Sequence, residues 1–296
     1  AGSSAMKTRP RRGRAAQQDN NEVEEKNERQ NNQDTSSRKK RKAVKRTSTT
    51  TGATKTKKKK SNDNAKNSDV VDSEEPWYTV YTKGDEEYNQ YMRTEWGFEK
   101  RGDEAMFEKL SLEGAQAGLS WLTILRKRDA YRTTFFNFDI DRVAAMTPED
   151  VQDILNTTGE TTRSTVVRHR GKIEAVINNA KCIQEMRSEE KNITSKDGRH
   201  NHGVFDRFLW SFVDDKPILN SAWDGRNLSD CPSTSPESNA MSKALKAKGF
   251  KFVGPTTCYS MMQAFGMVID HPVDSPEYKA AVGRLRKRPG GYQTRD

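Results

Sequence analysis

The amino-acid sequence predicts an all-α fold for residues 73–276, preceded by a disordered basic tail. Apolar residues recur at helical spacing from about Trp77 onward, and capping residues precede several of these segments. No convincing pair of strands is apparent. The predicted domain, of roughly 200 residues, is long enough to build one hydrophobic core.

Start and stop residues place the first helices. Asp103 is predicted to cap a helix that ends near Gly118, and Ser120 to cap a second helix across residues 121–136. Thr147, followed by a proline, marks a further helix start.

The second half of the domain continues the helical pattern. Residues 170–186 are amphipathic, residues 188–203 are polar and predict a surface loop, and residues 204–213 predict a short apolar helix. Two more helices follow, joined by a turn that contains Gly249 and Gly254. The last segment, residues 277–296, is basic and contains Gly and Pro, so it is expected to fray.

Residues 1–72 carry all the excess positive charge. Residues 1–70 hold twenty basic and eight acidic residues, whereas the whole chain has a net charge of +10. Because this region has no Phe, Trp, Tyr, Leu or Ile, it is expected to be disordered. The runs at 38–46 and 55–60 indicate a nuclear import signal or a DNA-binding arm. An organellar presequence and a tail that only aids solubility are the alternatives.

Composition also excludes several classes of protein. There is no apolar run of 18 residues and no secretory signal with an apolar core, so we expect no membrane partner. The three cysteines, Cys182, Cys231 and Cys258, are widely spaced, which argues for a reducing compartment rather than a disulfide framework.

The stretch LEGAQAGLSW, residues 112–121, suggests a ligand pocket. On a helix, Glu113 lies beside Leu110 and Trp121, facing the core, where an unpaired carboxylate is costly. Space beside Gly114 and a tryptophan would suit a flat, electron-poor or cationic ring. The alternative is a Glu113 tied to a nearby basic or amide group, with Trp121 simply in the core.

Two further features suggest contact with DNA. Gln116 and Leu119 face away from the apolar stripe, and an exposed Leu there would suit a wedge in a base stack. The turn before the last predicted helix exposes backbone N–H groups to a phosphate, with Lys251 and Thr256 nearby. An ordinary helical hairpin in the core is the alternative for that turn.

Six segments, in order, resemble the DNA-3-methyladenine glycosylase I family. They are YMRTEWG (91–97), MFEKLSLEGAQAGLSW (106–121), LTILRKR (122–128), VVRHRGKIEAVINNA (166–180), FLWSFV (208–213) and residues 233–271. The resemblance implies a helix–hairpin–helix DNA glycosylase fold and hydrolytic, monofunctional removal of N3-methyladenine in base excision repair. It also implies base flipping from double-stranded alkylated DNA without a cofactor. We expect a monomer.

The resemblance also implies roles for individual residues. Glu113 matches the family's pocket carboxylate, which makes it the candidate catalytic residue. The candidate base-binding residues are Tyr81, Tyr91 and Trp121. Gln116 and Leu119 match residues that fill the gap left in the duplex. The candidate backbone contacts are Arg168, Arg170, Lys172, Lys251, Gly254 and Thr256. Asp270 is a second candidate carboxylate, with a structural role as its alternative.

The sequence departs from the family at its zinc site. Bacterial members hold their chain ends together with two Cys and two His ligands, and of these only His271 remains. Met92 and Ser275 stand at ligand positions, so no zinc is expected. Packing around Trp77 would then close the domain. A damage-binding module that kept the scaffold but lost turnover is the rival to an enzyme.

Overall fold

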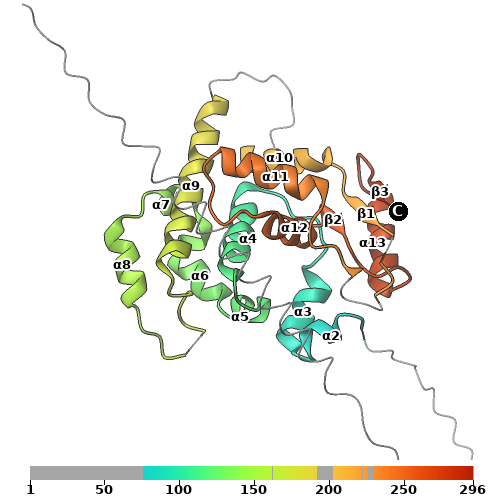
Figure 1. Ribbon diagram of the computed structural model, residues 1–296, viewed down its shortest axis with the longest axis horizontal. Coiled ribbons are helices and arrows are strands. Elements are labelled where there is room, and N and C mark those ends of the chain that lie inside the picture. Colours follow the sequence, from blue (N-terminus) through green and yellow to red (C-terminus); the bar gives the residue numbers. More distant parts are fainter. Residues whose placement is uncertain (1–75, 162, 192–202, 222, 226–229, 296) are drawn as a thin grey trace, which may run out of the picture. The chain divides into compact units, whose positions relative to one another are not determined.

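The computed structural model describes residues 76–295 apart from 162, 192–202, 222 and 226–229 (Figure 1). The described residues are mostly helical, which confirms the predicted fold class. The predicted basic tail and most of the predicted loop at 188–203 lie outside the described residues.

The elements are bounded as follows. The α-helices are α2 (Thr79–Thr82), α3 (Glu86–Thr94), α4 (Asp103–Gln116), α5 (Trp121–Leu125), α6 (Arg128–Thr134), α7 (Ile140–Ala144), α8 (Pro148–Asn156), α9 (Arg170–Lys191), α10 (Val204–Trp210), α11 (Pro236–Ala247), α12 (Pro255–Ala264) and α13 (Pro276–Arg286). The described residues also form the 3₁₀ helices η1 (Phe136–Phe138) and η3 (Ser211–Val213) and the strands β1 (Ile218–Asn220), β2 (Val268–Ile269) and β3 (Gln293–Arg295).

Helix α4 is central to the domain and contacts α9, α10 and α12 (Figure 1). Its apolar residues Met106, Phe107 and Leu110 are fully buried. A helix surrounded on several sides can hold a polar side chain only where that side chain has a partner. The surroundings of Glu113, near the C-terminal end of α4, therefore decide its role.

Two of the three predicted caps are confirmed. Ser120 accepts a hydrogen bond from the backbone N–H of Thr123 at 3.2 Å, and Thr147 forms a capping box with Asp150. The prediction for Asp103 is wrong: it is the first residue of α4, and its carboxylate accepts from the backbone N–H of Asp206. The single helix expected over residues 121–136 is divided into α5 and α6.

The predictions for strands and for the C-terminal end are also wrong. Strands β2, β1 and β3 form a parallel sheet in that order, and β3 comes from the segment that was expected to fray. Helix α13 begins after Ser275, which accepts from the N–H of Tyr278, and it buries Ala281 and Leu285 in a cluster with Leu219 and Ile269. This buried apolar surface fixes the C-terminal end to the domain.

No helix among the described residues has both the length and the apolar character needed to cross a bilayer.

Candidate functional site

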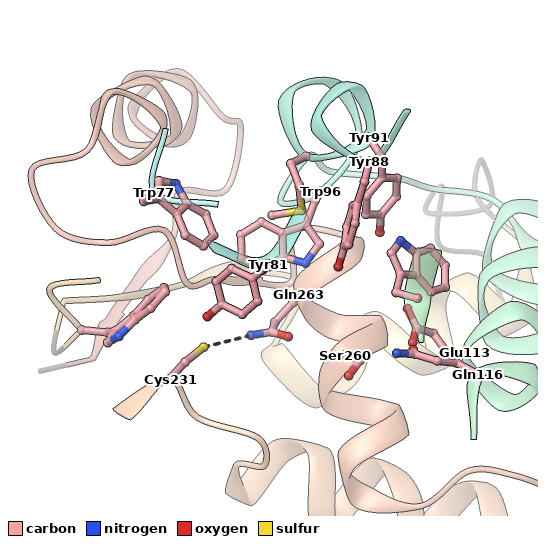
Figure 2. Close-up of a pocket in the computed structure, with 13 residues that line it drawn as sticks. Trp77, Tyr81, Tyr88, Tyr91, Trp96, Glu113, Gln116, Cys231, Ser260 and Gln263 are labelled. Atoms are coloured by element: carbon pink, nitrogen blue, oxygen red, sulfur yellow. Dashed lines mark hydrogen bonds between the residues drawn. The ribbon is translucent and has the colours of Figure 1, made fainter. Parts of the chain in front are cut away.

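An open cavity of about 170 Å³ lies where α2, α3, α4, α5 and α12 meet (Figure 2). It is lined by Trp77, Tyr81, Tyr88, Tyr91, Met92, Trp96, Glu113, Gln116, Trp121, Trp223, Cys231, Ser260 and Gln263. The structure thus brings together five of the predicted residues: Tyr81, Tyr91, Glu113, Gln116 and Trp121. Aromatic walls with few polar groups are typical of pockets for flat ligands.

Helix α3 supplies two neighbouring tyrosines. Asp85 caps this helix by accepting from the N–H of Tyr88, and Tyr88 and Tyr91 share one face because they are three residues apart. The Tyr91 ring lies 5.3 Å from the Trp121 ring and 6.3 Å from the Tyr88 ring, between centroids. Tyr88 was not predicted from the sequence, although its position three residues before Tyr91 places both on the same face of a helix.

Glu113 is both paired and next to the cavity. Only 6% of the residue is exposed, and its Oε1 lies 2.8 Å from the Nζ of Lys109, one turn earlier on α4. Both interpretations of this residue therefore hold in part: the carboxylate has a basic partner, yet it also lines an open space. Among the described residues, no hydrogen bond or ion pair engages Oε2 of Glu113, so that oxygen is left for a ligand.

Burial perturbs the groups next to Glu113. Desolvation, reinforced by the negative charge of Glu113, holds the pKa of Tyr91 well above its usual value. The Tyr91 hydroxyl therefore stays protonated and accepts a hydrogen bond from Lys109 at 2.8 Å. Desolvation also lowers the pKa of Lys109, although Glu113 opposes that change. The site thus contains a neutral phenol beside the paired side chains of Lys109 and Glu113.

The segment after α4 forms a tight turn at the cavity mouth. Ala117 has φ −45° and ψ 116°, Gly118 has φ +75°, and the N–H of Leu119 donates to the carbonyl of Gln116 at 2.6 Å. This is the geometry of a type II turn, which needs glycine at its third position. Leu119 is 40% exposed, as a wedge would be. The prediction that Gln116 faces away from the side of the helix that carries Glu113 is wrong, because both residues line the cavity (Figure 2).

Gly114 does not leave the space that was expected. A Cβ at this position would lie 3.1 Å from the Cβ of Phe252, so the glycine lets the turn between α11 and α12 pack closely on α4. The prediction of free space beside Glu113 at this glycine is therefore wrong. The cavity is bordered by aromatic rings of α3 and α5 instead.

The turn between α11 and α12 is clamped by α9. Asn179 accepts from the backbone N–H of Lys251 at 2.8 Å and donates to its carbonyl at 3.1 Å. Gly249 has φ +87°, and Gly254 is the N-cap of α12, followed by a proline. The clamp leaves the Lys251 and Thr256 side chains exposed at the start of α12, where a helix favours anions.

The basic residues of the RHRGK segment, 168–172, are not equivalent. Arg168 and Arg170 are exposed, and Arg170 contacts Gln152 at 2.6 Å. The Nζ of Lys172 instead donates to the carbonyl oxygens of Ala115 and Ala117. Two of its three protons are thus used within the protein, which argues against the predicted phosphate contact by this lysine.

Asp270 has a structural environment. Its buried carboxylate accepts hydrogen bonds from Asn220, from the Tyr259 hydroxyl at 2.7 Å and from Gln263 Nε2 at 2.7 Å. Three donors are the usual means of burying a carboxylate. Because Gln263 also lines the cavity, Asp270 orients an amide of the site rather than facing a ligand itself.

The positions that correspond to the zinc ligands do not fit a zinc ion. His271 is buried and lies against the Trp96 and Trp77 rings, at 5.1 and 6.2 Å between centroids. The Ser275 hydroxyl caps α13, and Met92 offers only a thioether. Among the described residues, no cluster of three or more His, Cys, Asp or Glu side chains suits a metal. One imidazole cannot provide a tetrahedral site.

Comparison with known proteins gives a consistent result. The family model described as methyladenine glycosylase matches residues 81–278. DNA-3-methyladenine glycosylase 1 of Escherichia coli is 44% identical over 63% of this chain and 88% of its own length. DNA-3-methyladenine glycosylase of Haemophilus influenzae is 41% identical over 64% of this chain and 91% of its own length.

These relatives correct the predicted location. They are bacterial proteins, from cells that have no nucleus, so the nuclear location inferred from the basic runs is not supported. The runs themselves lie outside the described residues.

Solved structures agree with the sequence relatives. A crystal structure of 3-methyladenine DNA glycosylase I has a TM-score of 0.56 and 42% identity, covering 65% of this chain and 94% of that protein. A structure of the Staphylococcus aureus enzyme, described as the structural basis of 3-methyladenine recognition, has a TM-score of 0.57 and 32% identity, covering 67% and 94%. With the family model matched across most of the described domain, this chain belongs to the methyladenine glycosylase family.

Proposed function

We propose that this chain is a monofunctional DNA glycosylase that hydrolyses the N-glycosidic bond of N3-methyladenine in alkylated double-stranded DNA, the first step of base excision repair. The observation that carries the proposal is the cavity that Tyr88, Tyr91 and Trp121 line together with the carboxylate residue Glu113. The names and bound ligands of its relatives support the same substrate.

The cavity suits a methylated purine for a chemical reason. Methylation at N3 makes adenine cationic, and aromatic faces attract a flat cation that has left the base stack. Oε2 of Glu113 accepts a hydrogen bond from the base at the inner end of the pocket. Normal adenine is neutral and gains less from the same surroundings, so the pocket selects the damaged base.

Hydrolysis needs little acid catalysis because the methylated base leaves as a neutral molecule. As the glycosidic bond lengthens, positive charge develops on the sugar, and the carboxylate of Glu113 stabilises it. Water then attacks the anomeric carbon and loses one proton to the solvent, and the neutral free base and an abasic site result.

The surrounding elements would hold and deform the duplex. Helices α11 and α12 act as a helix–hairpin–helix in which Lys251, Gly254 and Thr256 contact the DNA backbone. Arg168 and Arg170 add phosphate contacts from the start of α9. Leu119 and Gln116, on the turn after α4, fill the gap left by the flipped base. The domain works as a monomer.

Release of N3-methyladenine from methylated duplex DNA, followed by chromatography of the free base, tests the proposal directly. Purified full-length protein should release the base faster than the spontaneous rate in the absence of added zinc. Tight binding to methylated DNA without release would instead favour the damage-binding module and contradict the enzyme.

A further inference from the structure

Lys109 is a buried cation that meets three groups of the pocket at once. Its Nζ lies 2.8 Å from Oε1 of Glu113 and 2.8 Å from the Tyr91 hydroxyl. The same nitrogen lies 3.6 Å from the centre of the Trp121 ring and 5.0 Å from that of Tyr91. An ammonium group has three donors, and here they are surrounded by an acceptor, a phenol and an aromatic face.

The ammonium lies behind the wall of the main cavity. Tyr91 and Trp121 line both the main cavity and a second one of about 50 Å³, whereas Lys109 lines only the second. The lysine therefore contacts the base-binding side chains from the side opposite the predicted base. A group in this place cannot touch the substrate, but it can determine where the groups that touch it are held.

We propose that Lys109 is a positioning residue of this pocket, whose buried ammonium fixes Glu113, Tyr91 and Trp121 in the arrangement that receives the damaged base. The proposal rests on the proposed function for its substrate. Lys109 also compensates the charge of Glu113, so the pocket carries no net negative charge from this pair. Selectivity for the methylated base then depends on one directed carboxylate oxygen and on the aromatic ring faces.

Charged and titratable groups from each neighbouring element face Lys109. Glu95, at the end of α3, lies in this environment, and its carboxylate is bound by Arg128 of α6 at 2.8 Å and by Lys100 at 3.0 Å. The Arg128 guanidinium and its neighbours hold the pKa of Glu95 below its usual value despite burial, and Glu95 keeps the pKa of Arg128 raised.

The two tyrosines of α3 do not titrate in the accessible range. Burial raises the pKa of Tyr88 and of Tyr91 well above their usual value. Burial disfavours the charge of Lys109 and lowers its pKa, whereas the pKa of the neighbouring base Arg128 is raised. A loss of activity at alkaline pH that belongs to this site should therefore follow deprotonation of Lys109.

A double-mutant cycle of K109M, E113Q and K109M/E113Q tests the positioning role. Single-turnover release of N3-methyladenine should fall about 10- to 100-fold in K109M, because small displacements of reacting groups have effects of that size. In the E113Q background, the same Lys109 change should reduce release by a clearly smaller factor, because the part of its effect that acts through Glu113 is already lost. Unchanged release in K109M, or an equal loss in both backgrounds, would overturn the proposal.

The pH dependence of base release gives a second test, because a purely structural role of Lys109 would not change it. Wild-type release should fall as pH rises through the lowered pKa of Lys109. K109R, which has room in the neighbouring cavity, should recover part of the activity and move this fall to higher pH, since guanidinium stays charged. K109M should show no such fall. The same alkaline profile in wild type and K109M would contradict the assignment.

K279M makes the same chemical change at an exposed lysine of α13 and should match the wild type in every assay. Failure of the wild type to release the base would refute the proposed function. The coupling of Lys109 to Glu113 would then be read from denaturant unfolding of the four proteins of the cycle, where additive effects would overturn the pairing itself.

Discussion

The ammonium nitrogen of Lys172 lies 2.6 Å from the carbonyl oxygen of Ala117 and 2.9 Å from that of Ala115. The last carbonyls of a helix have no partner within it, and a cation near them is favourable. Lys172, on the first turn of α9, therefore supports the end of α4 and the turn that carries Gln116 and Leu119. Helix α9 thus holds in place the turn that carries the exposed Leu119.

Lys172→Met should weaken this support without removing a phosphate contact. We expect the free energy of unfolding to fall by about 1 kcal/mol and release of N3-methyladenine to fall severalfold. The slope of DNA affinity against salt concentration should stay unchanged, because a lost phosphate contact lowers that slope by about one. R168M, at an exposed arginine of the same segment, is the control that should lower it. A reduced slope in K172M would instead show that Lys172 does contact a phosphate of the DNA.

Glu113→Gln separates recognition of the base from binding of the duplex. Release of N3-methyladenine should fall about 100-fold or more, because a neutral amide cannot stabilise the developing positive charge. Binding to undamaged duplex should remain nearly intact, since Glu113 lies inside the pocket. E104Q, at an exposed position of the same helix, should behave as wild type. Equal loss of release and of duplex binding would refute the role of Glu113.

Helical periodicity predicted Glu113 and Trp121 on one face of a helix. They do line one cavity, but from two helices, α4 and α5, that are joined by the turn at Gly118. A basic partner for Glu113 was considered as the alternative, but Lys109, four residues before it, was not identified as that partner. A lysine is usually solvated, and only packing of α3 and α5 around it shows that it is buried. Gln263 of α12 was missed because nothing local links it to α3.

The small sheet could not be foreseen for a similar reason. Strands of two or three residues are too short to show alternation, and β1 pairs with segments about 50 and 75 residues further along the chain. The C-terminal helix was hidden by a basic composition, since Ala281 and Leu285 are its only fully buried side chains. The fold class, by contrast, followed from caps and periodicity that each helix carries in itself.

Removing residues 1–70 tests the basic tail independently of the pocket. The truncated protein should retain release of N3-methyladenine, because every residue that lines the cavity lies beyond this segment. Its affinity for DNA should fall and depend less on salt, since the removed segment carries twenty basic and eight acidic residues. Loss of release at saturating protein would show that the tail is part of the catalytic unit.

His271 should make the stability of the domain depend on pH. Burial, reinforced by Arg284, lowers its pKa to about 4, whereas an unfolded histidine has a pKa of about 6.5. The unfolded chain therefore binds more protons between these values, so the contribution of His271 to stability is complete above about pH 6.5. It is lost as pH falls towards 4, by roughly 3 kcal/mol in total.

Denaturant unfolding at several pH values measures this effect when the wild type is compared with H271Q, because the other acidic groups titrate in both proteins. The wild type should lose more stability than H271Q between about pH 6.5 and 4. H169Q, at an exposed histidine, should follow the wild type. A chelator should leave the unfolding curves unchanged, since Trp77 and Trp96 surround the imidazole where a metal would bind. Parallel pH curves for wild type and H271Q, or destabilisation by the chelator, would show that His271 is not the neutral, ring-packed residue described.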